Sequence, residues 1–326
     1  MIGGLWGWVS CTSPAEHANP LDPQSPSYTT TGAITGFATS YYQPFQPVAG
    51  AMVHLLPGDR ITECDANGRY LFADVPPAGY SLAVSAPGFQ TVTVSLQVLS
   101  RQLHTQDVRL NGLPVFQSPR ATSARVATAN ASTGIADLLF LNLEASVSDP
   151  DGANDIKKVQ VTIPDVAFLD TLGRSTVSSR WERLLTPDEL VGIDLFNLVG
   201  KPMEVTAEDA PGARVTSAPF FLARVIAEVP QVTAPDSLKS VSSGIPNFYW
   251  QVPAVPFAHT LRIEVYRLLG GFPTFVTAIG NIAAGTPSAV YPGRLSAGTY
   301  YWTLTVQDEY GNSSRSIEAT FEVPAN

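Results

Sequence analysis

The feature that most constrains this chain is a series of short alternating segments in residues 62–96, separated by turn residues. In residues 80–85 apolar side chains alternate with small or polar ones, which is the period of a half-buried strand. Asn67-Gly68 predicts a two-residue hairpin turn, because these residues tolerate positive φ. Pro87-Gly88 ends one strand before the next begins. The segment therefore predicts a compact β module.

The composition favours β structure for the whole chain and excludes some classes of partner. The 326 residues are enough for two or three domains, and 44% of them are hydrophobic while 14% are charged. The 27 prolines and 25 glycines suit turn-rich β structure. A net charge of -9 argues against a nucleic-acid partner and against electrostatic adhesion to an anionic membrane.

The N-terminus begins with an apolar run that is too short to span a bilayer and ends in Val9-Ser10-Cys11. This pattern resembles a bacterial lipoprotein signal, in which a small residue precedes the cysteine that receives the lipid. The resemblance implies that residues 1–11 are the signal, that Cys11 is lipidated, and that the lipid anchors the chain to a membrane. The alternative is a disordered N-terminus with a chance cysteine.

Residues 12–31 are polar and rich in proline and serine. They cannot bury enough apolar surface to become ordered, so they are predicted to form a disordered tether. A tether after a lipidated cysteine would hold a folded body away from the membrane.

Residues 32–112 are predicted to form the first folded domain. The expected strands are residues 34–38, 52–56, 69–75, 80–85, 91–96 and 104–110. The strand and turn signals occur in the order Gly36 and then residues 47–53, 65–72, 75–80 and 86–89. This order resembles the carboxypeptidase regulatory-like (transthyretin-like) β-sandwich. The resemblance implies an accessory domain of secreted and surface proteins, sometimes grouped with carbohydrate-binding-like folds, that contributes no catalytic residues.

Two further β-sandwiches are predicted, an immunoglobulin-like one in residues 113–227 and a fibronectin type III-like one in residues 228–326. Residues 297–302 resemble the sixth strand of the latter fold. In residues 205–212 and again in 304–312 a strand ends in acidic residues and turns on glycine, as in the final hairpin of an immunoglobulin-like sandwich. The predicted fold class is all-β, with three tandem sandwiches.

Acidic residues in the second domain form a candidate calcium site. Asp149, Asp151, Asn154 and Asp155 follow its second strand, and Glu208 and Asp209 lie in its last hairpin. These two loops should meet at one end of the sandwich, where oxygen ligands could hold calcium. Apart from calcium, no cofactor is expected. The alternative is that they are solvated turns, since Asp-Pro-Asp-Gly is a common turn sequence and the spacing is not that of an EF-hand.

Aromatic residues supply the other candidate site. Tyr41, Tyr42 and Phe45 fall in a proline-containing loop and could stack on sugar rings or peptide. Packing over an open end of the sandwich is the alternative. Phe272 and Phe275 are placed in a turn with the same two possibilities. The remaining predictions are structural: Trp250 and Trp302 in the core, Cys64 as a small half-buried residue, and a short helical turn or helix at residues 186–189 from its capping-box spacing.

The sequence lacks zinc-binding, nucleophile-elbow and phosphate-loop motifs, so no enzymatic activity is predicted. We expect a lipid-anchored, extracytoplasmic structural, adhesion or scaffold protein of a bacterial envelope, at the outer membrane or cell surface in a Gram-negative cell. A carbohydrate-binding surface module is the first alternative. An accessory subunit of an envelope enzyme or transport complex is the second. The expected partner is an envelope protein or a glycan.

Overall fold

The computed structural model describes residues 19, 22–25, 28–128, 137–178 and 180–325. The chain divides into two compact units, residues 1–113 and 114–326. Cys11, the predicted signal and most of the predicted tether lie outside the described residues. In the part of the chain that is described, no helix is both long and apolar enough to cross a bilayer. The fold is all-β, with tandem β-sandwiches, as the alternation predicts.

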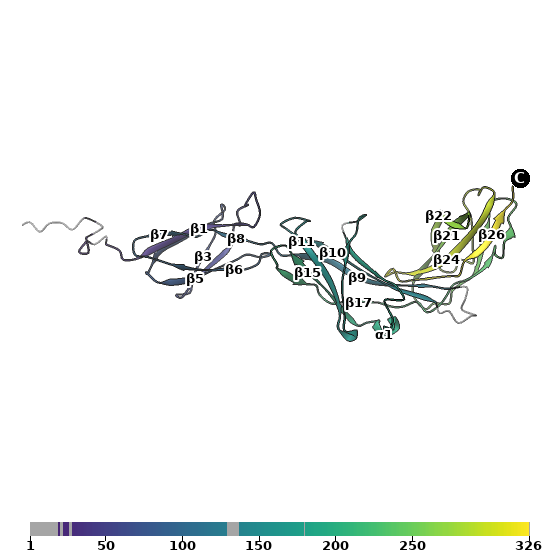
Figure 1. Ribbon diagram of the computed structural model, residues 1–326, viewed down its shortest axis with the longest axis horizontal. Helices are drawn as coiled ribbons and strands as arrows, with labels where there is room; N and C mark the ends of the chain where they lie inside the picture. Colours follow the sequence, from purple (N-terminus) through teal and green to yellow (C-terminus); the bar gives the residue numbers. More distant parts are fainter. Residues whose placement is uncertain (1–18, 20–21, 26–27, 129–136, 179, 326) are drawn as a thin grey trace, which may run out of the picture. The chain divides into compact units, whose positions relative to one another are not determined.

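The first unit is a sandwich of two four-stranded sheets (Figure 1). One sheet has the order β3 (Arg60–Glu63), β2 (Met52–Leu56), β5 (Gly79–Ser85), β6 (Val92–Gln97). In the other, β1 (Gly32–Ser40) pairs with β4 (Arg69–Val75) on one side and with β7 (Leu103–Thr105) and β8 (Val108–Leu110) on the other. Ile34, Leu55, Phe72 and Leu82 are buried between the sheets. The core thus comes from the alternate apolar positions of each strand.

Two details of this unit correct the expectations. The prediction of a hairpin at Asn67-Gly68 is wrong. Strand β3 pairs with β2 whereas β4 pairs with β1, so the turn at Asn67-Gly68 connects strands of two different sheets. The Asp65 carboxylate closes that turn by accepting the N–H groups of Asn67 and Arg69 at 2.8 and 2.9 Å. The strand predicted at residues 104–110 is interrupted at Gln106. Its carbonyl oxygen lies 1.8 Å from where a Cβ of Gly36 would stand, so only glycine fits there.

The second sandwich opens the second unit. One sheet has the order β13 (Gly173–Arg174), β14 (Arg180–Leu185), β10 (Leu138–Ser148), β9 (Val115–Val126). The other has the order β12 (Phe168–Thr171), β11 (Ile156–Ile163), β15 (Pro202–Asp209), β16 (Arg214–Thr216). Strand β17 (Phe220–Phe221) also pairs with β15. The capping-box contact at Thr186 forms, because the Glu189 carboxylate accepts its N–H at 2.9 Å. The segment forms the predicted helical turn, in which the Leu190 N–H donates to the Thr186 carbonyl at 3.1 Å, and it does not extend into a helix. The α-helix of this sandwich is α1 (Leu195–Leu198), capped by Asp194.

The third sandwich packs β22 (Phe272–Ala283), β21 (His259–Leu269), β24 (Gly298–Asp308), β26 (Ala319–Val323) and β19 (Lys239–Ser240) against β18 (Gln231–Ala234), β20 (Asn247–Gln251) and β23 (Ser288–Val290). Trp250 and Trp302 are buried in its core, which confirms that prediction. Phe272 and Phe275 lie in strand β22, not in the predicted turn, which is formed by Gly270 and Gly271.

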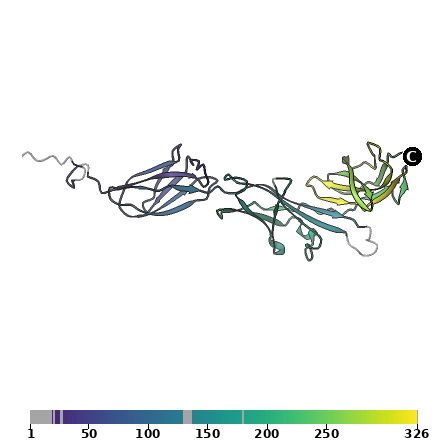
Figure 2. The same cartoon turned by 45° about the horizontal axis from the view of Figure 1, so that its top comes forward.

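A parallel strand pair joins the second and third sandwiches into one sheet. Residues 124–126 of β9 pair with β25 (Ser313–Arg315), which also pairs with β24. Among the described residues this sheet has ten strands. In both views the teal end of β9 runs beside the yellow strands of the third sandwich (Figures 1 and 2). The connection between these sandwiches is therefore more than the short segment around Pro230.

Candidate functional site

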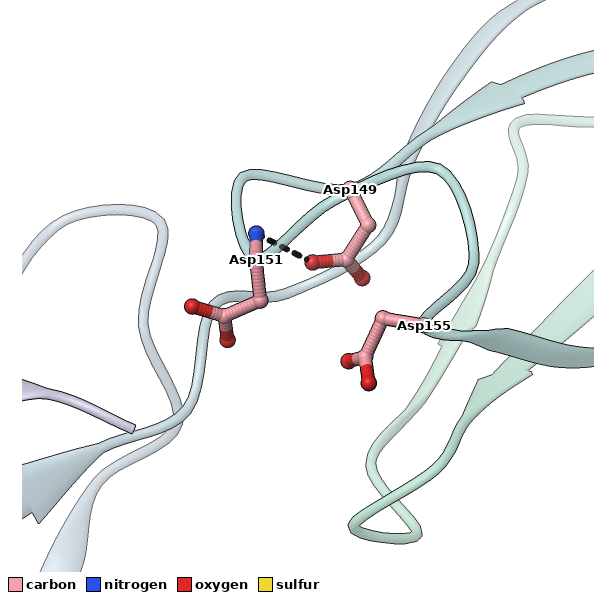
Figure 3. Close-up of side chains that lie close together, drawn as sticks. All are labelled: Asp149, Asp151 and Asp155. Atoms are coloured by element: carbon pink, nitrogen blue, oxygen red, sulfur yellow. Dashed lines mark hydrogen bonds between the residues drawn. The ribbon is translucent and has the colours of Figure 1, made fainter. Parts of the chain in front are cut away.

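Three carboxylates converge in the loop between β10 and β11 (Figure 3). Ligand oxygens of Asp149, Asp151 and Asp155 all lie within 4.8 Å of one another. The loop folds this way because the Asp151 N–H donates to Asp149 Oδ1 at 2.8 Å and the Gly152 N–H donates to the Asp149 carbonyl at 3.1 Å. A side chain that caps its own turn in this manner fixes the position of the carboxylate.

The last hairpin of the second sandwich meets this loop, as its place in the fold predicts. The Ala210 N–H donates to the Asp155 carbonyl at 2.8 Å. Asp209 is fully buried, and its Oδ1 accepts the N–H groups of Gly212 and Ala213 at 2.8 and 2.6 Å. The negative charge of Asp209 is close enough to act on Asp149. The two loops therefore share one end of the sandwich.

Three of the six predicted ligands are not part of the cluster: Asp209, whose Oδ1 accepts two backbone N–H groups of its own turn, and Glu208 and Asn154. Glu208 is ion-paired with Lys157 at 3.9 Å and with Arg214 at 2.7 Å. Asn154 Oδ1 accepts a hydrogen bond from Arg174 at 3.4 Å. Spacing alone did not reveal these basic neighbours, which come from other strands. The candidate set is thereby reduced to Asp149, Asp151 and Asp155.

The surroundings of Asp149 disfavour its ionised form. Burial, followed by the charges of Asp155, Asp151 and Asp209, raises the pKa of Asp149 to about 6 against the hydrogen bond from the Asp151 N–H. Its Oδ2 is buried and has no hydrogen-bond partner among the described residues. A buried acceptor without a partner is costly, and calcium prefers hard oxygen ligands of this kind. The residues present therefore fit a calcium ion.

The predicted aromatic site divides into two parts. Tyr41 and Tyr42 form an edge-to-face pair with ring centroids 5.1 Å apart, and both are about 40% exposed. Phe45 lies under the Arg109 guanidinium, whose central carbon is 4.2 Å from the ring centroid. Phe45 therefore belongs to a different surface from the tyrosine pair.

That surface is a hollow of about 520 Å³ lined by Phe37, Thr39, Phe45, Asp107 and Arg109. Four of these five residues were not predicted as site residues. Alternation indicates that Phe37 and Thr39 share the outer face of β1. It does not indicate that β8, distant in sequence, lies parallel to that strand.

Cys64 is buried rather than half-buried, with 4% of its surface exposed. Burial, assisted by the charge of Asp65, raises the pKa of the thiol to about 11. The thiol is therefore protonated at neutral pH, which suits a packing role in the first core.

Several solved structures are similar to this chain at low sequence identity. A search of curated proteins found no relative that matches this chain. The major pilin subunit BcpA of Bacillus cereus is similar over 90% of this chain and 95% of its own, at 10% identity and a TM-score of 0.31. The FN1–FN3 domains of chicken CNTN1 are similar over 86% and 92%, at 12% identity and a TM-score of 0.32. The fibronectin(III)-like modules of Clostridium thermocellum CbhA are similar over 65% and 95%, at 14% identity and a TM-score of 0.30.

A family model gives the more specific result. Residues 33–111 match the model of the carboxypeptidase regulatory-like domain. The matched residues fall within the predicted first domain, residues 32–112, and contain all eight strands of the first unit except the first residue of β1. The resemblance inferred from the order of turns and strands is therefore confirmed, and the first sandwich is a carboxypeptidase regulatory-like domain.

Proposed function

We propose that this chain is a lipid-anchored, extracytoplasmic structural or adhesion protein of a bacterial envelope, and that it catalyses no reaction. The observation that supports a structural role is the joint between the second and third sandwiches. Strand pairing of β9 with β25 makes the two sandwiches share a sheet, so neither can swing freely on a linker. A stiff body is what a surface protein needs to project its loops.

Buried polar contacts fasten this joint. The Arg224 Nε lies 3.1 Å from Asp308 Oδ2, and the Arg224 guanidinium lies 4.1 Å from the centroid of Phe257. Asn312 Oδ1 accepts the Ser123 N–H at 2.9 Å. These contacts connect residues of both sandwiches, and because Asp308, Ser123 and Asn312 are buried, the polar bonds that they form are costly to break.

The anchor is tested by intact mass and fractionation of the wild-type chain and of Cys11→Ser. We expect a wild-type mass that begins at Cys11 and includes a diacylglycerol and an acyl chain. The variant should lose the lipid and the membrane fraction. Cys64→Ala is the matched control, because it removes the other cysteine and should stay lipidated. A soluble, unmodified wild-type chain that retains Met1 would contradict the anchor.

The structural or adhesive role is tested in cells that lack the protein. We expect weaker attachment to surfaces or a more permeable envelope, restored by the wild-type chain but not by Cys11→Ser. Unchanged attachment and permeability in the deletion strain would contradict the role, whatever the result for the lipid.

We propose calcium binding by Asp149, Asp151 and Asp155 as a second function. It is favoured by the buried Asp149 Oδ2, which has no partner among the described residues. Bound calcium would compensate the clustered charges and hold the loop between β10 and β11 in place. Calorimetric titration of the full chain with calcium chloride should give a saturable heat that Asp149→Asn abolishes. Asp188→Asn, which removes an exposed acid elsewhere in this sandwich, should bind like the wild type; absence of heat with the wild type would contradict the proposal.

A further inference from the structure

We propose that the hollow lined by Phe37, Thr39, Phe45, Asp107 and Arg109 binds one ring of an uncharged glycan. This inference deepens the adhesive function proposed above, because it names a site and a ligand class for it. It also moves the predicted glycan contact away from the pair Tyr41 and Tyr42, which do not line the hollow.

Strand register places four of these side chains on one surface. Along β1 buried and more exposed residues alternate, so Phe37 and Thr39 both face away from the core. In the parallel pair of β1 and β8, Thr39 lies opposite Arg109. Asp107, two residues earlier, accepts the Phe37 N–H at 3.0 Å. Strand β1, strand β8 and the residue before β8 therefore present an aromatic ring, a hydroxyl and two charged groups side by side.

The loop after β1 supplies the fifth side chain. The Ser40 N–H donates to the Gln46 carbonyl at 2.8 Å, and the Gln46 N–H donates to the Ser40 hydroxyl at 2.8 Å. A bridge between Thr39 and Pro47 closes the loop at its base. This holds the Phe45 ring against Arg109, and stacking on the ring holds the guanidinium in one plane.

The lining combines the groups that a sugar ring requires. A pyranose has apolar C–H faces and a rim of hydroxyls, and each hydroxyl both donates and accepts hydrogen bonds. Phe37, 43% exposed, offers an apolar surface for a ring face. Arg109 offers fixed donors, the Asp107 carboxylate offers acceptors, and the Thr39 hydroxyl can do either. A volume of about 520 Å³ lies in the range of small-ligand sites.

The balance of charge selects an uncharged ring. Arg109 forms no ion pair with any described residue, but Asp107 shares the hollow with it. An acidic sugar would gain from Arg109 and lose against Asp107, and an amino sugar would do the reverse. A peptide that adds a strand is disfavoured, because β1 is already paired on both edges. A neutral sugar is the ligand that uses all five groups without an unpaired charge.

The test is saturation-transfer NMR and calorimetry on the full chain with cellohexaose, maltohexaose and a mannose oligomer as neutral probes. Trigalacturonate and a chitosan oligomer serve as charged probes. We expect at least one neutral oligomer to bind and the charged ones to bind more weakly. Phe37→Ala and Arg109→Lys should each lower the affinity roughly tenfold, since the first removes the apolar surface and the second the planar donor fork.

Tyr41→Ala is the matched control, an exposed aromatic on the same loop but outside the hollow, and its affinity should stay within about twofold of the wild type. Melting temperatures near the wild-type value would show that the variants fold. If Phe37→Ala does not fold, Arg109→Lys still tests the site, because it keeps the positive charge and removes only the planar donor fork. Binding of no neutral oligomer, tighter binding of a charged one, or unchanged binding by Arg109→Lys would overturn the inference. An attachment defect in the deletion strain together with no glycan binding would leave the adhesive function standing and remove this site alone.

Discussion

Asp209 and Asp308 occupy the same place in the last hairpins of the second and third sandwiches. Asp209 Oδ1 accepts the N–H groups of Gly212 and Ala213, and Asp308 Oδ1 accepts those of Tyr310 and Asn312. The likeness continues down the strands. Val205 N–H donates to the Ser217 hydroxyl at 3.1 Å, and Leu304 N–H donates to the Ser316 hydroxyl at 3.0 Å. The internal repeat predicted from the sequence is thus confirmed in its hydrogen bonds.

The two hairpins differ in what surrounds the buried carboxylate. Asp308 is paired with Arg224 and accepts the Asn312 side-chain N–H at 2.9 Å. At the position equivalent to Asn312 the other hairpin has Ala213, and its surroundings include the charge of Asp149. The comparison shows that the same turn can have two different roles. Where the protein itself supplies the cation, as Arg224 does for Asp308, the turn connects the two sandwiches. Where carboxylates lie beside the turn instead, the neighbouring loop between β10 and β11 becomes a candidate metal site.

The largest expected effect comes from breaking the joint. Asp308→Ala leaves Arg224 without its buried partner and two N–H groups without their acceptor. We expect a loss of about 3–5 kcal/mol in the free energy of unfolding of the second unit. Urea unfolding followed by tryptophan fluorescence measures it. Glu309→Ala removes the exposed partner of the same Arg224 and should cost less than about 1 kcal/mol. Equal losses in the two variants would show that burial of the pair is unimportant.

Asn312→Ala tests whether the side-chain amide couples the sandwiches. The Ser123 N–H loses its acceptor, and we expect a cost of about 1–3 kcal/mol in the free energy of unfolding. The single urea transition should split into two, because the contact joins the two sandwiches. Ser313→Ala changes a neighbouring side chain without this bond and should keep one transition. A single unshifted transition in Asn312→Ala would assign the coupling to strand pairing alone.

Asp149→Asn sharpens the comparison at the other hairpin. With a chelator present at pH 7.5, we expect the melting temperature of the variant to rise by about 2–4 °C, because one of the clustered charges is removed. With calcium present, the wild type should gain stability and the variant should not. Asp188→Asn should show neither change. A variant that melts below the wild type in chelator would contradict the charge argument.

The smallest effect concerns pH. Asp149 has a pKa of about 6 in the folded chain and an ordinary value of 3.8, so the folded state holds this proton more tightly. Its contribution to stability is fully present below the ordinary value and is lost as the pH rises through 6. In chelator, the melting temperature of the wild type should fall by about 1–2 °C relative to Asp149→Asn between pH 4.5 and 7. A constant difference would mean that Asp149 ionises normally.

The alternation of side chains predicts most strands but not their partners. Period-two patterns show which residues share a face, so Trp250 and Trp302 are correctly assigned to the core. They cannot show that the strands before and after Asn67-Gly68 join different sheets. The acidic loops could be placed together because the sandwich fixes where its hairpins end. The basic partners of Glu208 and Asn154 could not be predicted from the sequence, because they come from other strands.

The pairing of β9 with β25 also sets an order of events during synthesis. Ser123 and Asn312 are 189 residues apart, and the N-terminal parts of a chain generally fold first. The second sandwich must therefore form while residues 124–126 of β9 still expose unpaired backbone groups. Such an edge can pair with the wrong strand, and contacts across so long a stretch of chain form slowly. Strand β25 closes that edge, so a chain that stops before residue 313 would leave it open to association with other chains.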